Sequence, residues 1–156
     1  MNLVLPPSTE KTEMAADGKY LKHLEMIQAV ITRLAGNSFS MKGWSITVIA
    51  ALMALAAKEA NERYAAVALF PALCFWGLDA YYLRQERLFR RLYDAVRSEE
   101  KVGKPPEPIP LLSMNTKLIE ASVESWFCIV ISGTVFWLHF PIVVSVVVVT
   151  IYASIY

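Results

Sequence analysis

The last 31 residues of this 156-residue sequence contain no Asp, Glu, Lys or Arg. A water-soluble domain of this size has no element that could cover so long an apolar segment, so the missing charge predicts contact with lipid. Charge is also absent from residues 43–57, and Asp79 is the single charged residue of 64–83. We therefore expect an all-α integral membrane protein whose charged residues, 19% of the chain, are segregated from these runs.

Other absences narrow the class of protein. Residues 1–17 lack the basic start and long apolar stretch of a secretory signal peptide, and we expect a disordered tail there. Cys74 and Cys128 form no CxxC motif and lie in apolar runs, which indicates buried thiols rather than a metal site or a disulfide framework. No GxSxG, HExxH, Walker or paired-carboxylate pattern is present, so neither an enzyme nor a cofactor is expected, and no nucleic-acid partner.

The two internal apolar runs predict a helical hairpin in the membrane. The first, about residues 40–57, has an uncharged stretch of roughly 22 Å, which is short for a bilayer, so its flanking lysines must snorkel. The second, 64–83, is long enough to span. The connecting residues 58–63 are few, and this forces the two spans to lie antiparallel.

The C-terminal run allows two arrangements. As one helix it would measure about 46 Å, which is too long for a perpendicular span. Either an interfacial helix with Trp126, Phe127, Val130 and Ile131 precedes a third span over about 132–152, or two short spans turn at residues 139–141. We prefer three spans to four, because a turn in lipid must satisfy its backbone polar groups and residues 139–141 contain no glycine. Pro141 then kinks the helix without ending it.

The distribution of positive charge predicts the orientation. Thirteen of the 15 Lys and Arg residues precede the first span or follow the second, and two, Lys58 and Arg63, lie in the hairpin loop. By the positive-inside rule the N-terminus and residues 84–117 are cytoplasmic, and the expected location is a bacterial inner membrane.

Helical periodicity continues outside the lipid. Residues 19–35 predict an amphipathic N-terminal helix that stops at Gly36-Asn37, and the second span is expected to continue as one helix from about 65 to 98. Apolar residues on these two helices form a predicted packing seam, within one protomer or between protomers. The seam consists of Tyr20, Leu24, Ile27, Ile31, Leu34, Tyr82, Phe89, Leu92 and Val96.

The prolines of residues 102–112 predict an extended linker. It separates residues 18–101, with the hairpin and its cytoplasmic helices, from residues 113–156, where 116–125 predict a short amphipathic helix along the membrane surface.

Two groups of charged residues are candidates for function. Asp79 in the second span lies at about the depth of Lys42, so a structural Lys42–Asp79 ion pair is expected, and the alternative is that Asp79 lines an intersubunit path or couples the cytoplasmic helices to the spans. Arg84, Arg87, Arg90 and Arg91 form a basic juxtamembrane group. Its expected partner is anionic lipid, and the alternatives are a small anionic ligand or an acidic protein.

Two stretches resemble a family of small, mostly uncharacterised bacterial membrane proteins. They are residues 19–44, with Asn37-Ser38-Phe39 and Lys42-Gly43-Trp44, and residues 75–93, with Phe75-Trp76, Leu78-Asp79 and Arg90-Arg91. The resemblance covers about residues 19–98, implies one C-terminal span, and supplies no catalytic residues. The architecture is also similar to that of two-span, SLATT-like effectors of bacterial anti-phage systems, which damage the inner membrane when a sensor triggers them.

These observations lead to two expectations about function. The first is a homo-oligomeric effector that forms a pore or disrupts the inner membrane in antiviral defence. Short spans and the small side chains of the first span (Ala50, Ala51, Ala54, Ala56 and Ala57) favour close association of helices. The second is a non-catalytic anchor or adaptor that recruits a cytoplasmic protein through its helices.

Overall fold

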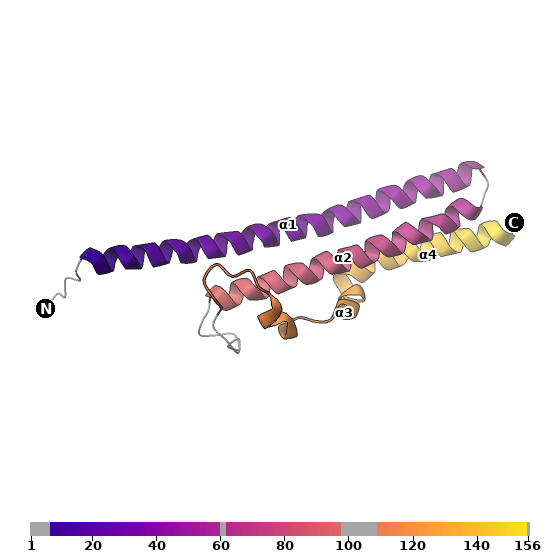
Figure 1. Cartoon of the computed structure of the whole chain (residues 1–156). Coiled ribbons are helices and arrows are strands. Elements are labelled where there is room, and N and C mark those ends of the chain that lie inside the picture. Colours follow the sequence, from indigo (N-terminus) through magenta and orange to yellow (C-terminus); the bar gives the residue numbers. More distant parts are fainter. Residues whose placement is uncertain (1–6, 60–61, 98–108, 156) are drawn as a thin grey trace. The chain divides into compact units, whose positions relative to one another are not determined.

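The computed structural model of the chain describes residues 7–59, 62–97 and 109–155, in which all regular structure is helical. The elements are α1 (Pro7–Glu59), α2 (Glu62–Arg97), the 3₁₀ helix η1 (Lys117–Ser122), α3 (Trp126–Val130) and α4 (Gly133–Ile155) (Figure 1). In these residues three helices, within α1, α2 and α4, are long and apolar enough to cross a membrane. The predicted all-α membrane protein with three such helices is confirmed. The four-span alternative is wrong, because residues 139–141 lie inside α4.

The chain divides into two compact units, and α1 and α2 contribute to both. The first unit comprises Met1–Thr32 and Arg87–Val123, and the second comprises Arg33–Glu86 and Glu124–Tyr156.

The first unit is held together by the packing seam. Ile27 and Ile31 of α1 and Leu92 of α2 are buried with Ile119 of η1. Phe89, Tyr93, Val96, Ile109 and Met114 pack against this cluster. Tyr20 donates a hydrogen bond to the carbonyl oxygen of Val96 at 3.4 Å, so α1 and α2 run antiparallel here. The seam residues of this cluster therefore pack against each other within one chain, and Ile109, Met114 and Ile119 cover them.

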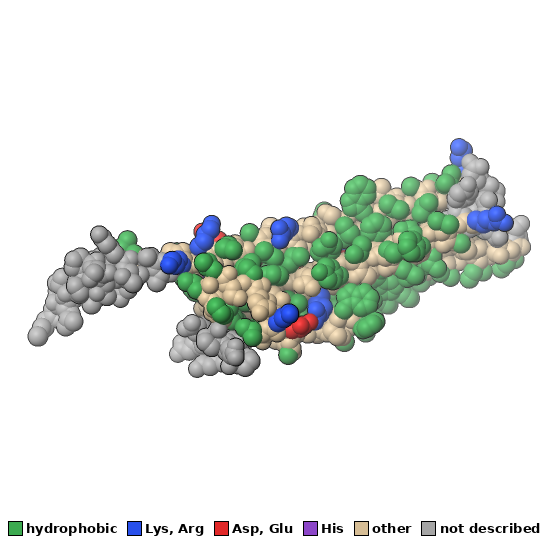
Figure 2. Space-filling view, viewed as in Figure 1, with side chains coloured by type: hydrophobic (Ala, Val, Ile, Leu, Met, Phe, Trp, Pro, Cys, Tyr) green, Lys and Arg blue, Asp and Glu red, His purple; other side chains and the backbone are tan. Residues whose placement is uncertain are grey.

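The second unit packs α4 against the hairpin of α1 and α2. Its core joins Ile49 of α1, Ala68 and Ala72 of α2 and Val146 of α4. Small side chains on α2 let the neighbouring helices approach closely. Hydrophobic side chains are spread along the helices on the face shown in Figure 2, as lipid contact requires.

Two predicted interruptions are absent from α1. The expected stop at Gly36-Asn37 is wrong, because α1 continues through both residues and Gly36 does not adopt the positive φ of a helix C-cap. Ending the helix here would leave backbone groups without partners beside the membrane. The expected disordered tail is also wrong over residues 7–17, which belong to α1. Pro7 suits a first turn, where its missing N–H has no partner in any case, and no proline or glycine interrupts 8–17.

The segment after α2 is also partly different from the prediction. Residues 98–108 lie outside the described residues, and they include 102–108 of the proline-rich linker. The predicted amphipathic helix over 116–125 is a shorter 3₁₀ helix, η1, because the backbone at Val123 is already extended. Its Ile119 packs in the seam cluster rather than along a membrane surface. A short helix, α3, is present before the third candidate span, where an interfacial helix is expected, and its position at a membrane interface stays a prediction. α4 begins after Ile131 and Ser132 and continues through Pro141.

Candidate functional site

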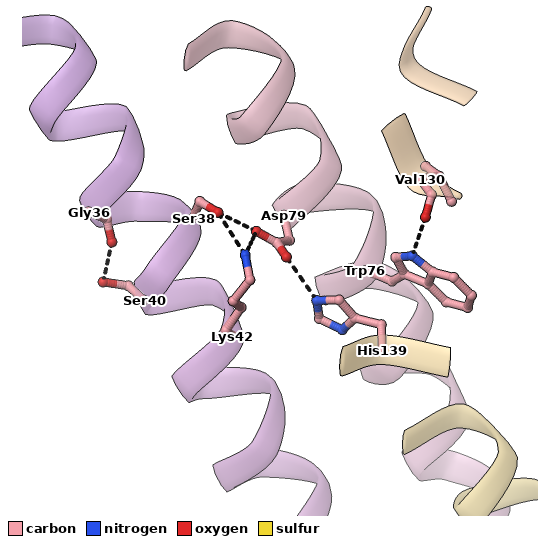
Figure 3. A network of polar contacts seen from close by, with 8 residues as sticks. All are labelled: Gly36, Ser38, Ser40, Lys42, Trp76, Asp79, Val130 and His139. Atoms are coloured by element: carbon pink, nitrogen blue, oxygen red, sulfur yellow. Dashed lines mark hydrogen bonds and ion pairs between the residues drawn. The ribbon is translucent and has the colours of Figure 1, made fainter. Parts of the chain in front are cut away.

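The candidate site is centred on Asp79, whose side chain is 0% exposed inside the second unit. A carboxylate within a membrane span costs on the order of 2.5–3.5 kcal/mol at the bilayer centre by insertion scales, so its partners must use its acceptor capacity. Figure 3 shows Asp79 on α2 between side chains of α1 and of α4.

Two partners of Asp79 come from α1. Ser38 and Lys42 are four residues apart and therefore lie on the same face of that helix. Lys42 Nζ donates to Asp79 Oδ1 at 2.6 Å, and Ser38 Oγ donates to the same oxygen. Lys42 Nζ also donates to Ser38 Oγ at 2.9 Å. The side chain of Lys42 is 24% exposed, whereas that of Asp79 is fully buried.

The third partner, His139, comes from α4. Its Nε2 lies 3.1 Å from the other carboxylate oxygen, Asp79 Oδ2, and the side chain is 1% exposed. The imidazole stacks on the indole of Trp76, with ring centroids 6.2 Å apart and an interplanar angle of 13°. Nδ1 of His139 is buried and has no hydrogen-bond partner among the described residues. We call Ser38, Lys42, Asp79 and His139 the polar cluster; it links α1, α2 and α4.

Two tryptophan side chains form hydrogen bonds between α2 and the segment of the short helix α3, next to this cluster. Trp76 Nε1 of α2 donates to the carbonyl oxygen of Val130 at 3.0 Å, and Trp126 Nε1 of α3 donates to the carbonyl oxygen of Gly77 at 3.2 Å. A Cβ atom at Gly77 would lie 3.4 Å from the Trp126 ring, an ordinary van der Waals distance, so α3 packs directly against this turn of α2. These reciprocal bonds hold Trp76 where it stacks on His139.

The ion pair predicted between Lys42 and Asp79 is present in the structure. Sequence reasoning missed Ser38 and His139. The signals were available: Ser38 is one helical turn before Lys42, and His139 is the one residue in 126–156 that can carry a positive charge on its side chain. Neither signal identifies Asp79 as the shared partner, because that depends on how α4 packs against α2.

The predicted basic group is distributed along α2. Arg84, in the second unit, donates from Nε to the carbonyl oxygen of Glu124 at 3.3 Å, and it is half-buried. Arg87, Arg90 and Arg91 belong to the first unit, where Arg87 is half-buried and the other two are exposed.

The predicted seam is brought together only in part. Ile27, Ile31, Phe89, Leu92 and Val96 share one cluster, which Tyr20 joins through its hydrogen bond. Leu34 and Tyr82 belong instead to the second unit, and Leu24 is half-buried outside the cluster. His23 of α1 is also buried in this unit, although the sequence did not single it out. It is 1% exposed, and its Nε2 bonds the carbonyl oxygen of Ser113 at 2.8 Å.

Comparisons with known protein families, with curated proteins and with solved structures find no match to this chain. The described residues also contain no group of three or more His, Cys, Asp and Glu side chains that could hold a metal ion. The arrangement of the polar cluster can hold opposite charges between three helices, and its histidine can exchange a proton.

Proposed function

We propose that the chain is a homo-oligomeric effector of the bacterial inner membrane, which permeabilises that membrane in anti-phage defence. The observation that carries the proposal is the polar cluster. Intramembrane ionisable residues ordinarily mark ion or substrate paths or elements that switch. Here the carboxylate of Asp79 is enclosed within one protomer, so a rearrangement of α1, α2 and α4 would bring it to a surface that water or a second protomer can reach.

The membrane-facing surface supports the oligomer. Three of the large side chains on α1, α2 and α4 are more than three-quarters exposed, namely Phe39, Phe70 and Trp137. Ala50, Ala51 and Ala54 of α1 are exposed as well and leave room for a neighbouring helix. The packing seam supplies no further argument for an oligomer, because its cluster is covered within the chain.

The direct test is the membrane potential of bacteria that produce the protein. We expect wild-type protein to depolarise the cells, measured with a potential-sensitive dye, and Asp79→Asn to abolish the effect because the cluster loses its only anion. A second variant, with Arg90 and Arg91 both changed to Gln, tests the contribution of the exposed basic residues.

Thr47→Val is the matched control for this test. Thr47 lies in the same span as Lys42, but its hydroxyl bonds the carbonyl oxygen of Gly43 in its own helix. It should depolarise cells as wild type does, at equal amounts of protein in the membrane. An unchanged potential with wild-type protein under every inducing condition, phage infection included, would contradict the proposal.

A second candidate function is a membrane adaptor. The observation in its favour is a turn of the first unit, in which Ser113 N–H donates to the carbonyl oxygen of Pro110 at 3.0 Å. Leu111 and Leu112 are exposed at this turn, and Leu112 adopts a φ of 66°, which is uncommon for a residue other than glycine. An adaptor predicts that a soluble protein copurifies at fixed stoichiometry, is lost with Leu111→Ser and Leu112→Ser, and leaves ion permeability unchanged.

A further inference from the structure

We propose that the polar cluster is a proton-binding site, in which Nδ1 of His139 takes the proton and the resulting imidazolium replaces Lys42 as the cation paired with Asp79. The inference rests on the proposed function for its consequence, permeability, while proton binding itself is open to separate measurement.

The hydrogen bond to Asp79 determines which nitrogen of a neutral His139 carries the hydrogen. An ionised carboxylate has no hydrogen to donate, so the hydrogen of the bond between Asp79 Oδ2 and His139 Nε2, 3.1 Å apart, belongs to the histidine. In the neutral imidazole Nδ1 then carries a lone pair. That lone pair is buried and has no donor among the described residues. A proton is the smallest ligand that this atom can take.

The charged groups around His139 determine what a second proton on its ring does. The charged groups that the structure places in the cluster are Lys42 from α1 and Asp79 from α2. Residues 126–130 of α3 and 133–155 of α4 contain no Asp, Glu, Lys or Arg. The expectation of buried cysteines is wrong, because Cys128 of α3 and Cys74 of α2 are both exposed. With a neutral imidazole the site therefore has no net charge. A proton on Nδ1 adds a second cation that competes for the one carboxylate.

The burial and the length of the two cationic side chains determine which of them stays paired with Asp79. His139 is 1% exposed and lies beside the stacked Trp76 ring, so its imidazolium stays next to Asp79. Lys42 is 24% exposed and has a long, flexible stem, so its ammonium group can move to the membrane interface. Protonation thus weakens the ionic link between α1 and α2 and strengthens the link between α2 and α4.

Histidine NMR of the full-length protein in lipid nanodiscs tests proton binding. The chain has two histidines, His23 and His139, and the variant His139→Gln assigns their signals. In spectra recorded from about pH 8 to pH 5, we expect the His139 signals to change from the neutral form with hydrogen on Nε2 to the doubly protonated form. A His139 that stays neutral over this range, or that carries its hydrogen on Nδ1 at pH 8, would overturn the inference.

Dye release from vesicles reconstituted with the protein tests the consequence. Wild-type release should be at least about tenfold greater at the acidic end of the same pH range, because the protonated fraction increases about tenfold per pH unit for as long as it is the minor form. His139→Gln keeps a donor for Asp79 but cannot be protonated, so its release should not depend on pH. Lys42→Met mimics the released lysine and should release dye at both pH values, while Thr47→Val should follow wild type.

The two experiments separate the failures. A titrating His139 with no dye release at any pH contradicts the pore and leaves the proton site. Release that is equal for wild type and His139→Gln at every pH contradicts the proton exchange and leaves the pore. Size-exclusion profiles and melting curves of each variant identify any that fail to fold, and the wild-type titration still decides the case.

Discussion

The polar cluster explains how a nearly charge-free segment keeps an aspartate. Asp79 accepts hydrogen bonds on both carboxylate oxygens, from a hydroxyl, an ammonium group and an imidazole. Each donor comes from α1 or α4, so the carboxylate is satisfied by tertiary neighbours and not by its own helix. The cost of removing it from water is offset only when these three contacts coexist.

Exposure predicts an asymmetry between the two ends of the ion pair. Lys42→Met leaves a fully buried carboxylate without a cation, and removal of one partner of a buried pair costs about 3–5 kcal/mol. Asp79→Asn should cost less, because the remaining lysine can extend to the interface. The double variant, with both Lys42→Met and Asp79→Asn, should lose about as much stability as Asp79→Asn alone.

Thermal unfolding in detergent, followed by tryptophan fluorescence, measures these three variants. Thr47→Val serves again as the control, since its hydroxyl takes no part in the cluster. Losses of stability that simply add in the double variant would show that Lys42 and Asp79 are not energetically coupled.

At the scale of elements, local sequence signals and tertiary contacts disagree at Gly36. Glycine followed by asparagine usually ends a helix, yet α1 continues, and Ser40 Oγ donates to the carbonyl oxygen of Gly36 at 2.9 Å. One turn further, Ser38 and Lys42 attach α1 to α2. The tertiary contacts of this face require a helical backbone and override the stop signal.

The sign of one substitution distinguishes a continuous helix from a helix end. A Cβ atom at Gly36 meets nothing within 4 Å, so Gly36→Ala should stabilise a helix interior by roughly 0.5–1 kcal/mol. In the left-handed conformation of a C-cap the same change would be destabilising. The melting temperature and the helical circular dichroism signal report the outcome, and Gly18→Ala, equally open around its Cβ, is the matched control. A lower melting temperature for Gly36→Ala alone would place a break in α1.

At the scale of the whole molecule, the number of spans determines on which side the chain ends. If all three candidate helices cross a membrane, residues 7 and 155 lie on opposite sides of it, and the positive-inside rule predicts that the N-terminal side is cytoplasmic. The side of the C-terminus is therefore a prediction that combines both observations.

Reporter fusions test this topology. A phosphatase that folds only outside the cytoplasm should be active when fused after Tyr156, and inactive when inserted within residues 102–112. Insertion at Asn61, in the hairpin loop, is the positive control. An active phosphatase inserted within residues 102–112 would contradict the predicted topology. So would an inactive phosphatase fused after Tyr156, provided that the fusion protein is stable.

The sequence by itself determined the helical class, the three apolar segments, the division between α3 and α4, and the ion pair of Lys42 with Asp79. These follow from properties that a linear pattern carries, namely the length of uncharged runs, helical periodicity and the depth of two charges on adjoining spans.

Only the tertiary structure decided that His139 and Ser38 complete the cluster, that His23 and Ile119 are buried in the first unit, and that α1 has no break. Periodicity assigns a residue to a face of its helix, but it does not say which helix that face meets or at what height. Burial of a charge and close packing of apolar side chains depend on that register, which arises only when segments distant in sequence pack together.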